Sequence, residues 1–356
     1  MAETASITRN RGTAAVPRLS VVIVNWRSAP DLAACLESVA RETRPELYEV
    51  IVVDNASFDG CGEMLATRHP DVLFIQSQEN LGFARANNLA ARVARGDVLL
   101  FLNPDTLIHD HAIEKMFDVT AGRADAGAVG ARLLNPDGTT QTSCVQAFPS
   151  VINQILDAEV LRRLAPRSRL WGSRAVAELG REPIPVEAVS GACLMVRREA
   201  FEQAGGFSSD YFMYGEDIDL CFRLARQGRV NLHCPDAVVT HLGGGSSRSR
   251  MSGFAAVMTR ESVMRFLAAH RGSRSASLYR FLMACSALIR LGLLAVAAAA
   301  KRGARRRHEY GPSITKWKAI WHWCWRRRET LISVGRLRPI YPGEGQVEKC
   351  AGSAAN

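Results

Sequence analysis

Short apolar runs alternate with amphipathic segments over the first 135 residues of the chain. The first of these runs is rich in β-branched residues, as in a strand that is buried on both faces, three more runs read as buried strands, and a fifth resembles them. In order along the chain, the runs are Leu19–Val24, Val50–Val53, Val72–Ile75, Val98–Leu102 and Ala126–Ala131. Their lengths predict strands, and the segments between the first four are long enough for one helix each.

Helical periodicity fills the gaps between the first four strands. Ser28 is placed to cap the first helix, and Ser57 is placed to cap the second, which ends before Pro70. A third helix is expected from about Phe83 to Gly96. This alternation predicts an α/β fold with a mostly parallel, doubly wound sheet, and ligands bind beyond the carboxyl ends of the strands in such sheets.

Polar residues stand directly after three of the predicted strands. Asn25 follows the first strand, Asp54 and Asn55 follow the second, and Asn103-Pro104-Asp105 follows the fourth. The Asp54 carboxylate could accept a hydrogen bond from a nucleobase imide or a ribose hydroxyl, and Asp105 could hold Mg²⁺ against a diphosphate. The alternative for both is that they only shape a turn.

A second acidic segment, Gly215–Leu220, carries three carboxylates in four positions. Like charges this close raise the pKa of at least one of them. Asp219 is spaced to pair with Arg223 along a helix. Glu216 or Asp217 is then left to act as a general base that deprotonates an acceptor hydroxyl.

His241 is the remaining candidate, because it ends an apolar run and precedes three glycines. A glycine-rich backbone can wrap a diphosphate, although a lone histidine is more often structural. The sequence contains neither a G-x-x-x-x-G-K-[ST] loop nor a G-x-G-x-x-G turn after the first strand. The sheet is therefore expected to bind its ligand by other means.

Seven stretches of the chain form a pattern when they are taken together and in order. They are Val21–Trp26, Val53–Gly60, Asn80–Asn88, Leu102–Thr106, Ser190–Val196, Gly205–Phe207 and Tyr214–Arg223. These stretches, which extend over about residues 19–245, resemble glycosyltransferase family 2 in the family's order and look closest to its rhamnosyltransferase branch. The resemblance implies a GT-A fold.

The resemblance also implies a role for each candidate residue. Asp54 would contact the nucleobase, and Asp217 would be the catalytic base with support from Glu216. Asp105 would bind the metal as the last position of the family's D-x-D motif, of which this chain keeps one carboxylate, and His241 would be a further ligand. The donor pocket would be shaped by Asn25, Asn55, Asn80, Gly82, Asn88 and Asn103.

The implied activity is the inverting, metal-dependent transfer of one sugar per donor, with Mg²⁺ or Mn²⁺ as cofactor. The donor would be a dTDP- or UDP-sugar, with dTDP-rhamnose preferred, and the acceptor a lipid-linked or cell-envelope polysaccharide. Processive members carry Q-x-x-R-W, which this chain lacks. One alternative is a sugar nucleotidyltransferase, which needs a glycine-rich basic loop where Asn25–Pro30 stands. Another is a non-catalytic sugar-binding protein on the same fold.

Basic residues are concentrated near the C-terminus. Residues 270–340 contain 16 Lys and Arg against two Asp and Glu, in a chain of net charge +10. Such asymmetry predicts an anionic partner. Phe281–Ala300 is apolar except for Arg290, and we expect it to lie on an anionic membrane surface rather than to cross the bilayer. Nucleic acid is not expected as a partner, because no nucleic-acid-binding motif accompanies the charge.

Four of the six tryptophans follow this apolar segment. Tryptophan beside arginine suits a membrane interface, and the alternative is that the rings pack against the protein. Three of them, Trp317, Trp321 and Trp325, fall along one helical face, whereas Trp323 does not. We expect this segment, with tryptophan beside arginine, to contact the membrane.

These patterns divide the chain into a disordered lead-in (1–18), a catalytic domain (19–255), a helical basic region that associates with the membrane (256–340) and a flexible terminus (341–356). Nine cysteines occur without a C-x-x-C pair, as in proteins whose thiols stay reduced. The first 18 residues lack the apolar core of a secretory signal. The expected location is cytoplasmic, peripherally bound to the cytoplasmic face of the membrane, and no feature indicates an oligomeric state.

Overall fold

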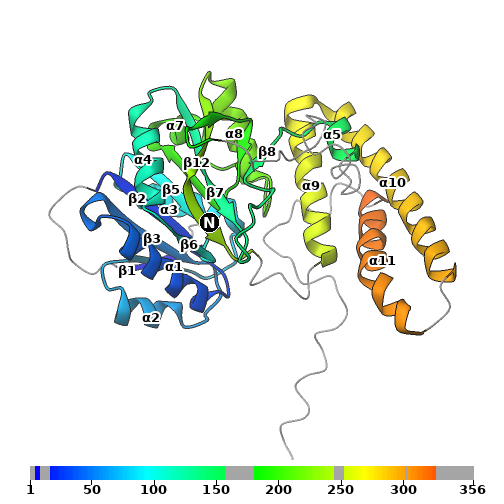
Figure 1. Cartoon of the computed structure of the whole chain (residues 1–356), viewed down its shortest axis with the longest axis horizontal. Coiled ribbons are helices and arrows are strands. Elements are labelled where there is room, and N and C mark those ends of the chain that lie inside the picture. Colours follow the sequence, from blue (N-terminus) through cyan, green and yellow to red (C-terminus); the bar gives the residue numbers. More distant parts are fainter. Residues whose placement is uncertain (1–4, 9–16, 157–179, 244–251, 301–303, 326–356) are drawn as a thin grey trace, which may run out of the picture. The chain divides into compact units, whose positions relative to one another are not determined.

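The computed structural model describes residues 5–8, 17–156, 180–243, 252–300 and 304–325. Residue contacts group the chain into two compact units, 1–324 and 325–356, and the first unit contains nearly all of the described residues. Within it, a mixed sheet carries helices on both faces, and three long helices follow in the chain (Figure 1).

Four parallel strands form the half of the sheet nearest the N-terminus. The strand order is β1-β4-β3-β2-β5-β11-β7-β12-β6, with β9 paired to β12. All four parallel strands were expected from their apolar runs, and their bounds are β2 (Leu19–Asn25), β3 (Tyr48–Asp54), β4 (Leu73–Ser77) and β5 (Val98–Leu102). The predicted α/β architecture with a mostly parallel sheet is confirmed in this half.

The other half of the sheet is mixed. β11 (Cys193–Arg197) lies antiparallel between β5 and β7 (Ala126–Leu134). β12 (Val230–His241) runs parallel to β7 and antiparallel to β6 (Thr106–Ile108), so it returns His241 to the segment that follows β5. The short remaining strands are β8 (Val145–Gln146), β9 (Ile184–Pro185) and β10 (Ala188–Val189).

Two apolar layers hold the helices against the sheet. Alternate residues of β2 point to opposite faces, so Val21 belongs to one layer and Val22 to the other. The first layer contains α1 (Ala29–Glu42), α2 (Cys61–Arg68) and α4 (Ala112–Gly122). The second contains α3 (Gly82–Val93), α7 (Arg198–Gln203) and α8 (Glu216–Arg226).

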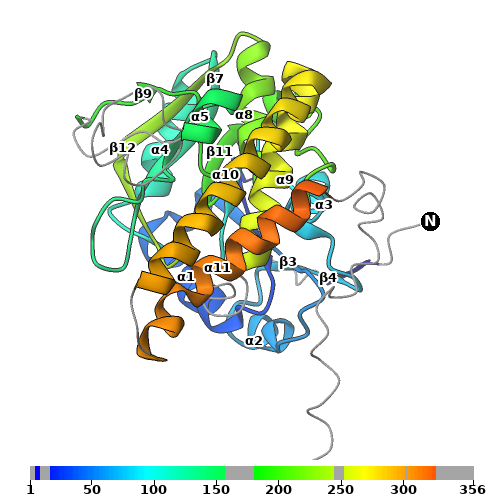
Figure 2. The same ribbon diagram turned by 90° about the vertical axis from the view of Figure 1, so that its right-hand side faces the viewer.

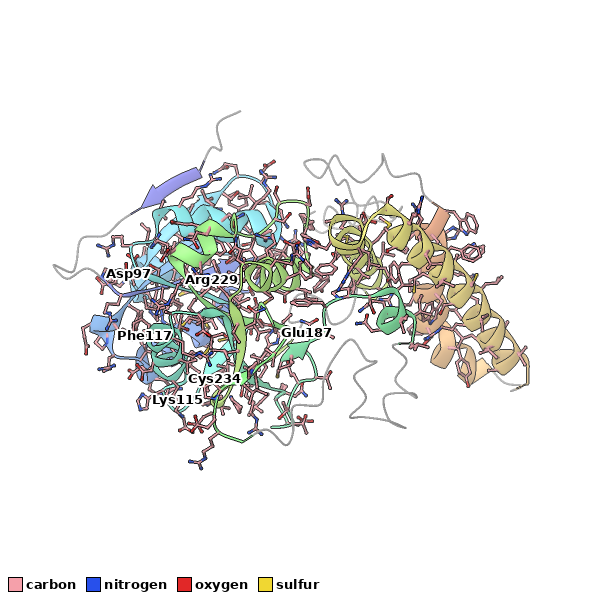
Figure 3. The ribbon with its side chains drawn as sticks, turned by 90° about the horizontal axis from the view of Figure 1, so that it is seen from above. Asp97, Lys115, Phe117, Glu187, Arg229 and Cys234 are labelled. Atoms are coloured by element: carbon pink, nitrogen blue, oxygen red, sulfur yellow. The ribbon has the colours of Figure 1, made fainter. Side chains whose placement is uncertain are left out.

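Helix α4 shows how the first layer closes over the sheet. Figure 3 shows Lys115 and Phe117 of α4 beside Cys234 of β12. Phe117 and Cys234 are buried, and the Lys115 Nζ lies 3.3 Å from an Asp236 carboxylate oxygen. The Phe117 ring and the aliphatic part of Lys115 thus cover the sheet, while the charged Lys115 ammonium group stays at the edge of the sheet.

Two local predictions were wrong. Residues 5–8, expected to be part of a disordered lead-in, form β1 (Ala5–Thr8), which pairs antiparallel with β4 at the sheet edge. Ser57 does not cap α2, whose N-cap is Gly60. Its hydroxyl instead donates to the Asp54 carboxylate, because the loop after β3 folds back on the strand end.

Buried His233 makes stability depend on pH. It is fully buried in β12, neither ring nitrogen has a hydrogen-bond partner among the described residues, and burial together with the charge of Arg132 lowers its pKa from 6.5 to about 4. Below pH 6.5 the unfolded chain therefore takes up this proton before the folded protein does. Stability falls as the pH decreases through this window.

We expect His233→Leu to remove this component. Between about pH 7.5 and pH 5 the wild-type free energy of unfolding should fall by about 2 kcal/mol more than that of the variant. Urea unfolding at the two pH values measures the difference. Equal pH dependence of the two proteins would contradict the prediction.

Three long helices follow the sheet: α9 (Ser252–Arg271), α10 (Ser273–Ala300) and α11 (Ala304–Trp325). Figure 2 looks onto the side of the structure on which these helices lie, and α9 and α10 are in direct contact. Short α5 (Val151–Leu156) packs against α10. The three helices share an apolar cluster of their own.

The tryptophans divide between this cluster and solvent. Trp323, which lies off the predicted stripe, is buried and donates a hydrogen bond of 2.8 Å to Glu261, and Trp317 is buried as well. Trp325 is exposed. The alternative that the rings pack against the protein therefore holds for Trp317 and Trp323.

Contacts with α8 attach α9 to the part of the structure that contains the sheet. The Asp219 carboxylate accepts from both Arg223 and His270, each at 2.7 Å, and the Asp219–Arg223 pair confirms the expected i,i+4 contact. Phe222 packs edge-on against Phe266 with ring centroids 5.2 Å apart. Ser262 donates to the Met213 carbonyl, just before α8.

Eight cysteines lie in the described part of the chain, and all are free thiols. Seven of them are buried and Cys285 is half-buried. The reading that the chain keeps its thiols reduced agrees with this arrangement. The predictions on the glycines that follow Gly243, on the end of the basic region (326–340) and on the C-terminus (341–356) concern residues outside those that the structure describes.

Candidate active site

Asn25 and Asp54 join the ends of β2 and β3. The Asn25 side-chain amide donates to Asp54 at 2.9 Å and also reaches Asp59. Asp54 is fully buried. Its second carboxylate oxygen accepts hydrogen bonds from the Gln76 side chain and from the backbone N–H groups of Ser57 and Phe58. These bonds fix the loop that covers the ends of the two strands.

The same network extends to the start of α3. The Asn55 amide donates to the Asn80 side chain at 2.9 Å and accepts from the N–H of Leu81 at 2.7 Å, and Asn80 accepts from the N–H of Gly82. Gly82 has a φ of +75°, and a Cβ there would stand 2.5 Å from the Phe212 carbonyl oxygen. At Gly82 the loop therefore lies directly against the segment that precedes α8, with no space for a side chain.

A second group of residues lies at the end of β5. The Nε2 of His241 lies 3.3 Å from an Asp105 carboxylate oxygen and 3.3 Å from the Asn103 amide nitrogen. Gln141 donates to the backbone carbonyl of His241 at 2.7 Å, which orients its amide oxygen toward the Nδ1 of the same residue, 3.0 Å away. The Gln141 amide oxygen thus accepts from Nδ1–H, and Nε2 is the ring nitrogen that faces Asp105 and Asn103.

This arrangement fits a divalent cation. Two neighbouring ligands of an octahedral ion at about 2.1 Å stand about 3 Å apart, close to the separation of the Nε2 and carboxylate oxygen. A histidine whose other nitrogen is held by a side-chain oxygen is the usual metal-binding form of the ring. Asp31 lies near this pair, since burial and then the charge of Asp105 raise the pKa of Asp31.

Asp54, Asp59 and Cys61 form another group whose potential ligand atoms lie within 4.8 Å of one another. The oxygens of both carboxylates already accept hydrogen bonds from Asn25 and from backbone N–H groups. Burial raises the pKa of the Cys61 thiol, which keeps it protonated, whereas metal binding needs a thiolate. Asp105 and His241 are therefore the better candidates for a metal site.

Glu216 and Asp217 open α8. Tyr214 and Gly215 both have positive φ, 67° and 85°, and this turn sets the N-terminus of the helix. Asp217 is partly exposed and accepts from the N–H groups of Gly191 and Ile218, each at 2.8 Å.

The two carboxyl groups differ in their surroundings. Glu216 is buried, and its Oε2 has no hydrogen-bond partner among the described residues. Burial and then the charge of Asp217 raise the pKa of Glu216, whereas the N–H groups around Asp217 partly offset the effect of burial on its own pKa. Glu216 is thus the member that keeps a proton, and Asp217 is the member that ionises.

One dipeptide connects the two carboxylate groups. The N–H of Gly191 binds Asp217, and the carbonyl of Ala192 accepts from the N–H of Asn103 at 2.9 Å. β2 and β5 are adjacent and parallel, so Asn25 and Asn103 end at the same edge of the sheet. Asp54, Asp105 and Asp217 therefore belong to one edge, as the sequence predicted.

Asn88 is the exception among the candidate residues. Its amide binds both the carbonyl and the N–H of Phe207, at 2.7 and 2.9 Å, on the side of α3 that faces α8. Its part in donor binding stays a prediction. Sequence reasoning missed Gln141 and Asp31, because Gln141 lies in an irregular segment and Asp31 reads as an ordinary first-turn acid.

Comparisons with known proteins agree with this geometry. Residues 20–205 match the family described as "Glycosyl transferase family 2", and residues 146–296 match "Glycosyl transferase family group 2". An N-acetylglucosaminyl-diphospho-decaprenol L-rhamnosyltransferase of Mycobacterium tuberculosis is 34% identical over 235 residues, which cover 63% of this chain and 75% of that protein.

Solved structures agree on the fold. A mannosyltransferase from Pyrobaculum calidifontis, in complex with GDP-Man and Mn²⁺, has a TM-score of 0.53 at 21% identity and covers 87% of this chain and 86% of its own. GalNAc-T7 with UDP, GalNAc and Mn²⁺ has the same TM-score at 16% identity, and the match covers 72% of this chain and 48% of that one. The fold is GT-A-like.

Proposed function

The chain belongs to glycosyl transferase family 2, and on this premise we propose that it is a metal-dependent, inverting rhamnosyltransferase that acts on a lipid-linked acceptor. The preferred donor is dTDP-rhamnose, and one sugar is transferred per donor. The single observation that carries the proposal is that Asp217 stands at the same sheet edge as the Asp105–His241 pair.

Each residue then has one task in the reaction. Asp217 removes the proton of the acceptor hydroxyl, and that oxygen attacks the anomeric carbon on the side opposite the leaving nucleoside diphosphate. One displacement inverts the anomeric centre without a covalent enzyme intermediate. A divalent cation, Mg²⁺ or Mn²⁺, on Asp105 and His241 would supply positive charge against the leaving diphosphate.

The donor side rests on the amide network. Asn25, Asn55, Asn80 and Gly82 hold the loops at the ends of β2 and β3, where the donor's base and ribose are proposed to lie. Asp54 accepts up to five hydrogen bonds from the protein, so its proposed part is to hold this loop and to offer its carboxylate to the nucleobase only if the loop moves.

A panel of nucleotide sugars tests the proposal. We expect dTDP-rhamnose with Mn²⁺ to raise the melting temperature more than UDP- or GDP-sugars, and to be consumed when a polyprenyl-diphosphate-linked N-acetylglucosamine is added. The anomeric configuration of the product reports inversion. Absence of transfer from every donor in the panel would refute the enzymatic proposal.

A lipid-linked acceptor lies in a membrane, so the protein needs a surface that binds the membrane. The exposed face of α10 is a candidate for that surface. Residues Ser273–Ala298 are long and apolar enough to cross a membrane, by length and composition only. The inner face of α10 packs in the helical cluster, whereas its outer face is an exposed apolar stripe at helical spacing. The stripe contains Leu278, Phe281, Leu288, Ile289, Leu293 and Val296.

We propose that this stripe lies on the cytoplasmic face of an anionic membrane. Arg290, the charge at its centre, stacks over the Trp317 ring at 4.5 Å and so belongs to the protein side. Arg271 and Arg274 are exposed at the start of the helix, where lipid phosphates would meet them. Peripheral attachment leaves the sheet edge open to nucleotide sugars in the cytoplasm.

Vesicle binding tests the stripe. Phe281→Ser with Ile289→Ser should abolish co-sedimentation with phosphatidylglycerol vesicles, because both side chains are more than 60% exposed and contribute little to the core. Phe58→Ser, an equally exposed residue elsewhere, serves as the control. Undiminished binding of the double variant would contradict this placement of the membrane.

A further inference from the structure

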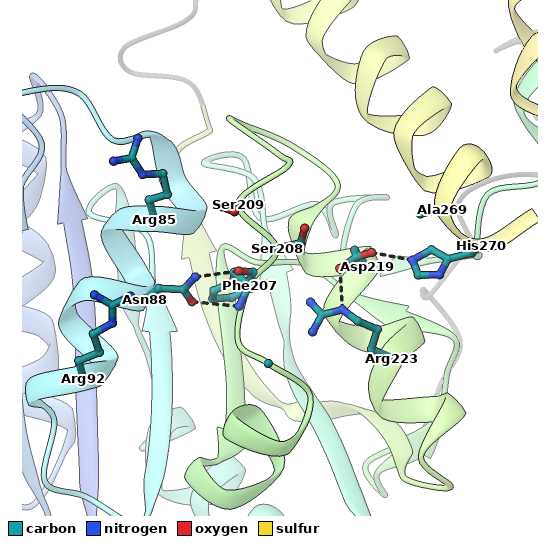
Figure 4. A pocket seen from close by; sticks show the side chains of 11 residues that line it. Arg85, Asn88, Arg92, Phe207, Ser208, Ser209, Asp219, Arg223, Ala269 and His270 are labelled. Atoms are coloured by element: carbon teal, nitrogen blue, oxygen red, sulfur yellow. Dashed lines mark hydrogen bonds and ion pairs between the residues drawn. The ribbon is translucent and has the colours of Figure 1, made fainter. Parts of the chain in front are cut away.

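A cavity of about 550 Å³ lies apart from the metal and base residues described above. Figure 4 shows Arg85 and Arg92 of α3 on one side and Arg223 of α8 with His270 of α9 on the other, and Ser208 and Ser209 lie between them. Its size is that of an ordinary small-ligand site. No residue assigned to the donor or metal sites lines it except Asn88.

The lining of the cavity is strongly basic. One carboxylate, Asp219, faces three arginines and a histidine. Asp219 is buried and already bonded to Arg223, His270 and the Tyr211 hydroxyl. Arg85 also pairs loosely with Glu79 at 3.5 Å, outside the cavity lining. An anion is the ligand that such a lining favours.

Arg223 supplies a donor that the protein leaves unused. Its Nε binds Asp219 and its Nη1 binds the Ala204 carbonyl. Its Nη2 is buried and has no hydrogen-bond partner among the described residues. Leaving a buried guanidinium N–H unsatisfied is costly, and a shift of the partly exposed Arg223 side chain toward an anion in the cavity would satisfy it.

The position of the cavity indicates which anion. Asp219 shares α8 with the proposed base, Asp217, but side chains two residues apart lie on different faces of a helix, so the cavity borders the helix of the base rather than the base itself. His270 is the second-last residue of α9, and α10 with its apolar outer stripe begins at Ser273. A molecule with a diphosphate in this cavity could therefore place a lipid along α10 and a sugar toward α8.

We infer that this cavity binds the diphosphate of a lipid-linked acceptor, separately from the nucleoside diphosphate of the donor. The inference rests on the proposed function, which it extends from the sugar to the group that carries it. Arg85, Arg92 and Arg223 hold the phosphate oxygens, and the serine hydroxyls complete their hydrogen bonds. Planar guanidinium groups suit phosphate better than lysine does.

Calorimetric titration of the full-length protein with inorganic pyrophosphate and with geranyl diphosphate tests the inference. EDTA in both titrations prevents binding through a cation at Asp105. We expect both ligands to bind and to compete, and Arg85→Gln with Arg92→Gln to weaken both at least about tenfold. Arg226→Gln, the same charge change on the exposed side of α8, is the matched control and should bind as the wild type does.

Two results would overturn the inference. One is unchanged binding of both ligands by a double variant that melts like the wild type. The other is binding of pyrophosphate without geranyl diphosphate, which would make the cavity a site for a free anion. Mn²⁺-dependent binding of dTDP should be the same in the double variant, and failure of sugar transfer from every donor would refute the proposed function while leaving this titration decisive.

Discussion

Asp217→Asn is expected to reduce sugar transfer by at least about a thousandfold, because the amide has no basic oxygen to take the acceptor's proton. The substitution keeps the shape of the side chain and one acceptor for the N–H of Gly191, so the loop should stay in place. Steady-state rates with saturating donor and acceptor measure the loss. Donor binding, followed by Mn²⁺-dependent thermal stabilisation, should be nearly unchanged.

Asp210→Asn, an exposed acid a few residues earlier, is the control for the charge change. The pH profile gives a second readout. Because burial raises the pKa of Asp217, the wild-type rate should fall with decreasing pH at a value above that of a free aspartate. Turnover by Asp217→Asn at the wild-type rate would remove this residue as the base.

His241→Gln is expected to abolish metal-dependent binding of the donor nucleotide and to lower turnover by about a hundredfold or more. Glutamine cannot present an imidazole lone pair beside Asp105, and the fixed bond to Gln141 is lost as well. Titration with Mn²⁺ in the presence of dTDP, followed by thermal unfolding, measures the effect. Without metal, the variant and the wild type should melt alike.

His109→Gln is the matched control, since His109 binds Thr240 on the same strand pair and lies outside the proposed metal site. Gln141→Leu provides a graded test. It keeps both candidate ligands but releases the ring, so Mn²⁺ affinity should fall by about 10- to 100-fold rather than vanish. Full Mn²⁺ response in His241→Gln would place the metal elsewhere, for which the group at Asp54 and Asp59 is then the next candidate.

Local pattern was enough to predict the parallel half of the sheet. Leu19–Val24, except for Ser20, and Val98–Leu102 are apolar because both of their faces are covered, and their short lengths favour strands over helices. The antiparallel insertion of β11 between β5 and β7 has no such signal, because strand order depends on how distant segments meet. β1 was missed for the same reason: Ala5–Thr8 is only four residues of mixed polarity, and its pairing with β4 brings together distant segments.

Residues of the candidate site were predictable where they stand directly beside the end of a predicted strand or the start of a predicted helix. Asp105 and Asp217 stand directly after a strand and at a helix start, positions that open onto the ligand edge of such a sheet. Gln141 and Gly191 act only through their partners, His241 and Asp217, and neither spacing nor residue type announces such a contact. Trp317 and Trp323 show the opposite case. Their composition resembles that of a membrane-contacting segment, but both rings pack in the apolar cluster of the three long helices.

The contacts between α8 and α9 also bear on how the enzyme can be produced and dissected. Cutting the chain near residue 255, where composition suggests a boundary, would strip Phe222 of its neighbour Phe266 and leave Asp219 buried without His270. The helix that starts with Glu216 and Asp217 would lose its outer support. In a shortened protein, loss of lipid attachment could therefore not be distinguished from disruption of α8. Only surface substitutions can separate these two effects.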